Sequence, residues 1–215
     1  MRLFAVYSLF LSYSFGSLAT ILNLRAVQSD GLASCPSAIE VNSTIINANG
    51  NEIQSRTFIC LDDSLSTHAA TTSQPRKSFN SPSELLRRSA AECKTPAPEC
   101  QCGLQFGCSC SQLTPSAPEG GDCRTLIDAL QVISQAGGPT FTVPSSGVLL
   151  LEFQTCAIEW INLRNAPLEY CWDELGRGTL VSLTDEECLI PAVSTGAACT
   201  PADALWLLQV FRVGT

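Results

Sequence analysis

Twelve cysteines constrain the fold of this 215-residue chain more than any other feature of its sequence. An even number of cysteines in an exported chain is typical of a disulfide framework, which adds the stability that a small apolar core lacks. The spacing alone leaves the connectivity open. We expect all twelve to be paired: Cys35, Cys60, Cys93, Cys100, Cys102, Cys108, Cys110, Cys123, Cys156, Cys171, Cys188 and Cys199.

A structural zinc site is the alternative use of these cysteines. Cys100 and Cys102, like Cys108 and Cys110, are separated by one residue, whereas zinc ligands usually have spacers of two to four residues. The single histidine, His68, lies far from both pairs in a polar stretch. We therefore expect no metal ion and no other cofactor.

The first residues indicate export. Arg2 precedes an apolar run over residues 3–15, and Ser17-Leu18-Ala19 forms a small-x-small cleavage site. These features predict a signal peptide over residues 1–19. The run is too short for a membrane anchor, which needs about 20 apolar residues. We expect a secreted, extracellular protein, with Asn42-Ser43-Thr44 as an N-glycosylation site at Asn42.

Residues 34–60 have the pattern of a β-hairpin. Apolar and polar residues alternate over 38–41 and 56–59, and Asn49-Gly50 lies between the two runs. An Asn-Gly step between alternating runs favours a tight hairpin turn. Cys35 and Cys60 flank the two arms, so a bridge between them would close a small hairpin module.

Residues 61–92 have the composition of a linker, rich in Ser, Thr, Ala and Pro and without periodicity. They contain two dibasic steps, Arg76-Lys77 and Arg87-Arg88. A dibasic pair in an exposed secreted linker is a good protease substrate. We expect processing after Arg87-Arg88 and a mature domain that begins near Ser89; the alternative is a short basic helix end.

Residues 93–215 form the third part, which contains ten of the cysteines and is strongly acidic. It has five Lys or Arg against thirteen Asp or Glu, so it accounts for the whole formal net charge of -8. An acidic domain repels phosphate backbones and anionic lipid headgroups. We expect no nucleic-acid partner and no stable membrane insertion.

The order of elements in this third part predicts an α+β fold. Residues 93–123 are dense in Cys, Pro and Gly, so we expect an irregular segment held by bridges. A helix should run from Cys123 to Ala136, capped by Asp122 and ended by residues 137–139. Strands are expected over these ranges: 140–143, 148–153, 156–163 and 205–213.

A second helix is expected from Leu168 towards Leu183, with Pro167 at its first position. Gly176 and Gly178 would weaken it by about 1 kcal/mol each relative to alanine. After Cys188 we expect a loop. Together these elements predict a small disulfide-rich α+β domain, with two helices packed on a mainly antiparallel sheet of about four strands.

Several motifs resemble a secreted family that is abundant in mushroom-forming fungi. The resemblance covers nearly all of the exported chain, and it is specific in cysteine spacing. The matching motifs are Ser34-Cys35-Pro36, Arg56-Thr57-Phe58-Ile59-Cys60, Cys110 followed by Gly120-Gly121-Asp122-Cys123, Pro167-Leu168-Glu169-Tyr170-Cys171, Cys188, Cys199 and the terminal stretch from Trp206 to Val213. Isolated matches are Ile127, Ala129, Leu130, Phe141, Val143, Cys156 and Asn162.

The family includes a mushroom glycan-binding, lectin-like protein with an αβα sandwich. The resemblance therefore implies an αβα-type sandwich and carbohydrate binding for this chain. The sequence departs from the family where residues 114–119 replace a glycine-rich run, where Cys93 and Cys100 look like an extra pair, and where Cys108 is displaced. Such loop changes affect the glycan site that the resemblance implies, and no family ligand residue is carried over.

The residues argue against most catalysis. The third part has no histidine, which removes Ser-His-Asp and Cys-His mechanisms. Carboxylate pairs of a glycosidase remain as an alternative, with Asp173-Glu174 and Asp185-Glu186-Glu187 as the densest acids. We interpret these acids as solvated surface, because most acidic side chains are exposed.

Sugar binding needs an aromatic face and planar polar groups. Trp160, Asn162, Arg164, Tyr170 and Trp172 cluster in the sequence, and we predict Trp172 and Asn162 as ligand-binding residues. The alternative is that Trp160, Tyr170 and Trp206 are core aromatic residues.

The leading functional interpretation is a secreted, non-catalytic glycan-binding protein whose partners are glycans or glycoproteins. The alternative is a secreted effector or toxin-like protein that acts on a protein or a membrane. An enzyme acting on polysaccharide comes third. The sequence does not indicate an oligomeric state.

Overall fold

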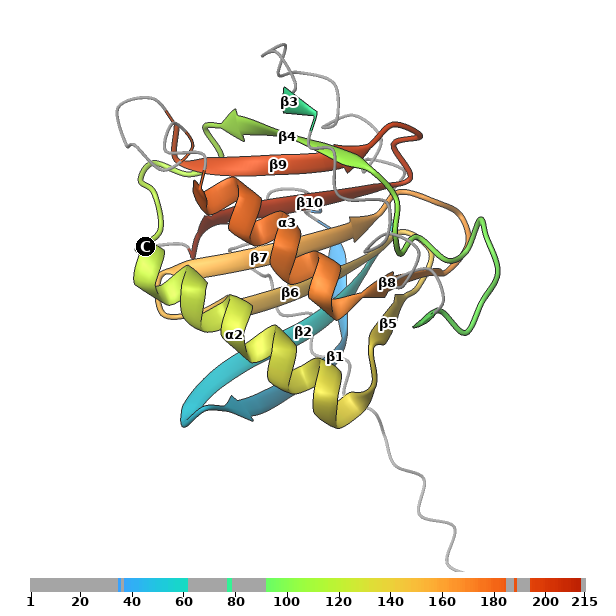
Figure 1. Ribbon diagram of the computed structural model, residues 1–215, viewed down its shortest axis with the longest axis horizontal. Helices are drawn as coiled ribbons and strands as arrows, with labels where there is room; N and C mark the ends of the chain where they lie inside the picture. The colour runs from blue at the N-terminus through green and yellow to red at the C-terminus, as the bar shows by residue number, and fades with distance from the viewer. Residues whose placement is uncertain are drawn as a thin grey trace, which may run out of the picture.

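A computed structural model describes residues 35, 37–61, 77–78, 92–184, 188 and 194–213 (Figure 1). The predicted signal peptide and the Arg87-Arg88 step lie outside these residues. In the described ranges the chain forms two long helices and ten strands. The elements are β1 (Ala38–Ala48), β2 (Asn51–Cys60), β3 (Lys77–Ser78), β4 (Phe106–Ser111), α2 (Gly120–Gly137), β5 (Thr140–Val143), β6 (Gly147–Phe153), β7 (Cys156–Asn162), β8 (Leu168–Cys171), α3 (Trp172–Thr184), β9 (Gly196–Pro201) and β10 (Trp206–Arg212).

The main sheet is larger than the sequence predicts. Eight described strands pair in the order β1-β2-β6-β7-β10-β9-β4-β3, while β5 and β8 form a separate two-stranded sheet. Every neighbouring pair is antiparallel, which confirms the predicted α+β class and its mainly antiparallel sheet. The expected count of about four strands is wrong, because the hairpin continues the sheet and two segments predicted as irregular form β4 and β9.

Strands β4 and β9 have little strand signal of their own. Their sequences, FGCSCS and GAACTP, are made mostly of small residues, which have low β propensity. They pair from Phe106↔Pro201 to Ser111↔Gly196, and the disulfide Cys108–Cys199 joins two residues that face each other in this register. Pairing and cross-linking therefore fix a conformation that local sequence does not indicate.

The predicted hairpin forms. Strands β1 and β2 pair from Ala38↔Cys60 to Ala48↔Asn51, and both turn residues have positive φ, 53° at Asn49 and 80° at Gly50. Two positive φ values are the signature of the tight turn that Asn-Gly favours. The Cys35–Cys60 disulfide closes the hairpin as expected. Strand β2 also pairs with β6, so the hairpin is continuous with the main sheet.

Helix α2 agrees with the predicted first helix but begins earlier, at Gly120. The predicted capping role of Asp122 is wrong: the N-cap is Glu119, and the Asp122 carboxylate accepts hydrogen bonds from Thr155 N (3.1 Å) and Thr155 Oγ1 (2.6 Å). Asp122 therefore ties the first turn of the helix to the β6–β7 turn. The helix ends at Gly137-Gly138, as predicted.

The predicted start of the second helix is also wrong. Residues 168–171 form β8, which pairs with β5 from Thr140↔Cys171 to Val143↔Leu168, and α3 begins only at Trp172. All four β8 side chains are buried, and Trp172 N donates to Pro139 O (3.0 Å). A four-residue strand buried on all sides shows no periodicity that distinguishes it from a helix.

Both described helices lie on one face of the main sheet, side by side (Figure 1). Helix α2 packs on β6 and β7, and α3 packs on β4, β9 and β10. The larger apolar core lies between these helices and the sheet. A second cluster, which includes Phe58, Val148 and Leu150, lies on the opposite face. Within the described residues no helix covers that face, so they do not form the αβα layering that the resemblance implies.

Gly178 of α3 allows the helix to pack closely on the sheet. A Cβ at Gly178 would lie 2.6 Å from Leu208 Cδ2 of β10, closer than any real Cβ contact. At Gly176, by contrast, a Cβ would make only an ordinary van der Waals contact, 3.5 Å from Leu130 Cδ1 of α2. The expected loss of helix propensity at Gly178 is therefore linked to tight packing of α3 on the sheet.

All twelve cysteines are paired, as predicted. The six disulfides are Cys35–Cys60, Cys93–Cys100, Cys102–Cys171, Cys108–Cys199, Cys110–Cys188 and Cys123–Cys156. No helix among the described residues has the length and hydropathy needed to cross a membrane.

Candidate functional site

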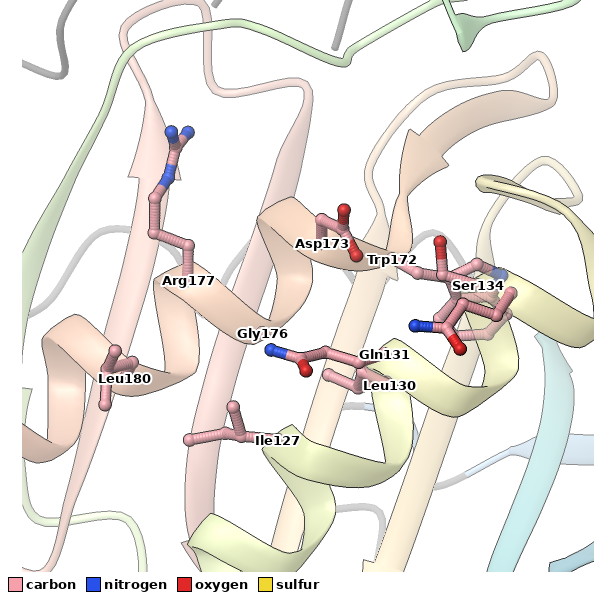
Figure 2. A pocket seen from close by; sticks show the side chains of 10 residues that line it. Ile127, Leu130, Gln131, Ser134, Trp172, Asp173, Gly176, Arg177 and Leu180 are labelled. Atoms are coloured by element: carbon pink, nitrogen blue, oxygen red, sulfur yellow. The ribbon is translucent and has the colours of Figure 1, made fainter. Parts of the chain in front are cut away.

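An open groove runs between α2 and α3 and encloses about 400 Å³ (Figure 2). Ile127 and Leu130 of α2 form its apolar floor with Gly176 of α3, and Leu180 of α3 lies at its edge. Leu130 is 1% exposed, whereas Leu180 is 45% exposed. Because Gly176 has no side chain, the floor stays open where the two helices approach each other.

Polar side chains surround this floor. Gln131, Ser134 and Gln135 come from successive turns of α2, and Asp173 comes from the first turn of α3. Gln131, Gln135 and Asp173 are exposed, and Ser134 is half-buried. The amides and the hydroxyl both donate and accept hydrogen bonds, while the ionised carboxylate only accepts them. The groove therefore offers several hydrogen-bonding groups to one solvent-accessible volume.

Trp172 lies at one end of the groove, as Figure 2 shows. Its side chain is largely buried, and its ring packs against Phe141 with centroids 4.2 Å apart and planes tilted by 36°. Packing against Phe141 fixes the orientation of the indole. The structure thus brings the predicted ligand residue Trp172 to the groove, where it forms an apolar wall.

Arg177 contributes little charge to the groove. Its guanidinium lies 3.7 Å from Glu174 Oε1 and 5.9 Å from the centre of the Phe106 ring. In Figure 2 the side chain points away from Ile127 and Gln131. The charged group that remains on the α3 side of the groove is the exposed carboxylate of Asp173.

Asn162, the other predicted ligand residue, is not brought to the groove. It is fully buried at the end of β7. Its Nδ2 donates to the carbonyl oxygens of Val143 (3.1 Å), Pro144 (2.8 Å) and Ala166 (2.9 Å), and its Oδ1 accepts from Arg164 N (2.9 Å). The side chain therefore holds the turns around β7 together, and it contributes no group to the groove.

The other large aromatic residues belong to the core, as the alternative interpretation held. Trp160, Tyr170 and Trp206 are fully buried, with ring centroids 5.0–6.0 Å apart. Burial and the nearby negative charge of Glu174 raise the pKa of Tyr170 well above its usual value, although Arg177 opposes the shift. Tyr170 therefore remains protonated at neutral pH, and none of the three rings lines the groove.

Glu169 of β8 anchors the loop that starts at Cys93. Its carboxylate accepts hydrogen bonds from Lys94 N (2.9 Å), Thr95 N (2.8 Å) and Thr95 Oγ1 (2.7 Å). Burial alone would raise the pKa of Glu169. The hydrogen bonds from Thr140, Lys94 and Thr95 outweigh it and lower this pKa from 4.5 to about 2. Glu169 is therefore a charged structural clamp at neutral pH.

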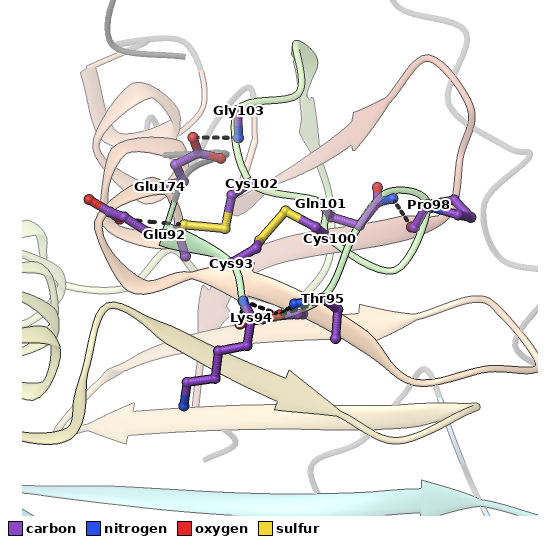
Figure 3. Close-up of a disulfide and its surroundings, with 12 residues drawn as sticks. Glu92, Cys93, Lys94, Thr95, Pro98, Cys100, Gln101, Cys102, Gly103 and Glu174 are labelled. Atoms are coloured by element: carbon purple, nitrogen blue, oxygen red, sulfur yellow. Dashed lines mark hydrogen bonds between the residues drawn. A yellow bond between two sulfur atoms is a disulfide. The ribbon is translucent and has the colours of Figure 1, made fainter. Parts of the chain in front are cut away.

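The neighbouring acids Asp173 and Glu174 point into different environments. Glu174 is 2% exposed, and its Oε1 accepts a hydrogen bond from Gly103 N (2.7 Å), as Figure 3 shows. Asp173 is exposed at the groove. The prediction that these acidic side chains are exposed to solvent is therefore confirmed for Asp173 and wrong for Glu174. The cluster Asp185-Glu186-Glu187 lies outside the described residues.

One group of sulfurs in the described part of the chain is close enough to hold a metal ion. The sulfurs of Cys93, Cys100 and Cys102 lie within 4.8 Å of one another. In this structure, however, each of them is in a disulfide. A thiolate is the metal ligand that cysteine provides, so the oxidised cluster is a cross-link.

The polar side of the groove was missed by sequence analysis. Ser134 and Gln135 lie three and four residues after Gln131, next to the apolar stripe that contains Ile127 and Leu130. This spacing places them on one helix face. Polar residues beside an apolar stripe are nevertheless common on any amphipathic helix, so only the position of α3 distinguishes them.

No family model, no curated protein and no solved structure matches this chain.

Proposed function

We propose that this chain is a secreted, non-catalytic glycan-binding protein and that the groove between α2 and α3 holds the sugar. The paired cysteines fit an oxidising, extracellular environment. The resemblance in cysteine spacing to a mushroom family with a glycan-binding member points to the same class of ligand. The groove itself supplies the apolar surface and the hydrogen-bonding groups that a sugar needs.

One observation carries this proposal: a single open groove combines an indole wall with amide, hydroxyl and carboxylate groups. Sugars present apolar C–H faces together with hydroxyls that donate and accept hydrogen bonds. Trp172 would pack against such a face, while Gln131, Gln135 and Asp173 would bind hydroxyls. A volume of about 400 Å³ lies in the usual range of small-ligand pockets, about 300–1,000 Å³.

A protein ligand is the second candidate, and the exposure of Leu180 favours it. Leu180 is 45% exposed at the edge of the groove, beside the apolar floor formed by Ile127 and Leu130. An amphipathic peptide helix can place its apolar face in a groove of this kind. This possibility corresponds to the secreted effector that the sequence left as the alternative function.

A glycan array with the secreted chain tests the proposal. Gln131→Ala should weaken binding about tenfold, because it removes a hydrogen bond to the ligand, and Asp173→Asn should weaken it because a neutral amide oxygen replaces the stronger, charged acceptor. Both side chains are exposed, so neither substitution should affect folding. Asp128→Asn is the matched control, because Asp128 is exposed on α2 but does not line the groove.

The outcomes separate the candidates. Array binding that is unchanged in Gln131→Ala and Asp173→Asn would place the glycan elsewhere. No binding to any glycan would contradict the proposal. If, in that case, Leu180→Asp abolished binding of a partner protein while Asp128→Asn did not, the groove would be a protein-binding site.

A further inference from the structure

No disulfide joins the hairpin to the rest of the chain. Cys35–Cys60 lies within the hairpin. The other five disulfides join cysteines between Cys93 and Cys199. No cysteine is left to form a bridge between the parts. The polypeptide over residues 61–91 is therefore the only covalent connection between the hairpin and the remainder of the fold.

Backbone pairing joins the hairpin to the sheet without any cross-link. Strand β2 pairs with β6 continuously from Gln54↔Glu152 to Ile59↔Gly147, and Cys60 N donates to Ser146 O (3.0 Å). In the main sheet β2 and β7 are the two neighbours of β6. The hairpin therefore supplies one complete side of the hydrogen-bonding of β6.

Side chains of the hairpin are buried on both faces of the sheet. Phe58 is 1% exposed and packs in a cluster with Val148 and Leu150 on the face away from the helices. Ile53 and Ala48 are 0% and 2% exposed, and they belong to the core on the helix face. The interface therefore has an apolar centre on either side of the strand.

A charge pair closes this interface. The guanidinium of Arg56 on β2 binds the carboxylate of Glu152 on β6, and it lies 5.4 Å from the centre of the Phe58 ring. The side chains of Arg56 and Glu152 are 17% and 14% exposed. The pair is therefore partly shielded from water, and it adds a side-chain contact between β2 and β6 to their backbone pairing.

We propose that residues 35–60 and the part from Glu92 onward form a non-covalent interface that survives cleavage of the linker, so that the processed protein is a complex of two chains. Cleavage at Arg87-Arg88 would then leave the hairpin in place, in contrast to a mature domain that consists only of the chain from Ser89. Loss of the hairpin would expose a free β6 edge with the run Gly147-Val148-Leu149-Leu150-Leu151, and a bare apolar edge is prone to aggregation.

An inserted cleavage site tests this proposal on the full secreted chain. A recognition sequence for a site-specific protease is placed between residues 79 and 91 and then cut. Non-reducing denaturing electrophoresis should separate two pieces, because no disulfide joins them. Size-exclusion chromatography without denaturant should give one peak that contains both pieces in a 1:1 ratio. Elution of the hairpin piece apart from a folded larger piece would overturn the proposal.

Substitutions in the cut protein test which contacts hold the complex. Arg56→Glu should release the hairpin piece, and Arg56→Glu combined with Glu152→Arg should retain it. Ile45→Ala is the control, because Ile45 lies on the same hairpin but is 65% exposed. Release in the Ile45→Ala control, or failure of the charge swap to restore co-elution in a chain that folds before cleavage, would contradict the proposed interface.

Discussion

The two sides of the main sheet are attached in different ways. At one edge the hairpin, residues 35–60, is joined to β6 by backbone pairing, apolar burial and one charge pair. Near the other edge the segment 93–111, which we call the cystine segment, is joined to residues 171, 188 and 199 by three disulfides. The hairpin is therefore held mainly by pairing and buried apolar side chains, and the cystine segment is held mainly by disulfides.

The difference explains how segments of unlike composition enter one fold. The hairpin contains Ile and Phe side chains in strand alternation, so pairing on β6 buries apolar area on both faces. The cystine segment has mostly small and polar residues, with Phe106 as its large buried side chain. Cross-links replace the missing burial there, because they reduce the entropy of the unfolded chain.

The largest effect should come from breaking a long disulfide loop of the cystine segment. Replacing both Cys102 and Cys171 by Ala opens a loop of about 25 residues, counted through the remaining Cys110–Cys188 bridge, and should lower the free energy of unfolding by about 3.5 kcal/mol. Cys93–Cys100, with a separation of 7, should contribute only about 2.5 kcal/mol. Urea denaturation of the two double variants measures both values. Equal losses would show that loop length does not determine these contributions.

Phe58→Ala should destabilise the hairpin side by about 3 kcal/mol, because it removes a ring that is 1% exposed and leaves a cavity. Ile45→Ala, on the exposed side of the same hairpin, should cost less than about 0.5 kcal/mol. Chemical denaturation of both variants gives the comparison. A small effect of Phe58→Ala would mean that the hairpin adds little to the sheet.

Glu169→Gln should lower stability at neutral pH by about 2 kcal/mol, because it removes charged acceptors from the amides of Lys94 and Thr95. The folded pKa of Glu169, about 2, lies below its ordinary value of 4.5. Its contribution is therefore complete above pH 4.5 and is lost as the pH falls towards 2. Denaturation at several pH values should show the two proteins converging at low pH. A difference in unfolding free energy that does not change with pH would contradict the proposed role of the Glu169 carboxylate.

The smallest effect is expected at the hairpin turn. Gly50→Ala should cost about 1 kcal/mol, because alanine is strained at a φ of 80° although nothing lies within 4 Å of the new Cβ. Gly121→Ala is the control, because Gly121 lies in the first turn of α2 and has equally open surroundings. Thermal unfolding compares the two, and equal midpoints would exclude a role for backbone strain.

Local signals predicted about half of the fold. Asn49-Gly50 with flanking alternation predicted the hairpin, and residues 137–139 predicted the end of α2. Strands β5, β6, β7 and β10 were also predicted close to their observed bounds. Strands β4, β8 and β9 were not, because their pairing partners are distant in sequence and their residues have weak or ambiguous preferences.

The candidate site was predicted only in part. Trp172 lines the groove, whereas Asn162 is a buried hydrogen-bonding residue of the scaffold. An asparagine near aromatic residues has the same appearance in sequence in either role. The relevant difference is whether its amide faces carbonyl oxygens of the chain or solvent, and that depends on the turns that surround β7.

The sequence by itself determined that the cysteines pair, that a hairpin turns at Asn49-Gly50, and that the chain is α+β. Such features depend on neighbouring residues or on composition. Only the tertiary structure decided that the hairpin completes β6, that the cystine segment reaches residues 171, 188 and 199, and that α2 and α3 enclose a groove. Those features depend on the free energy of contacts between residues far apart in the chain, which no local pattern encodes.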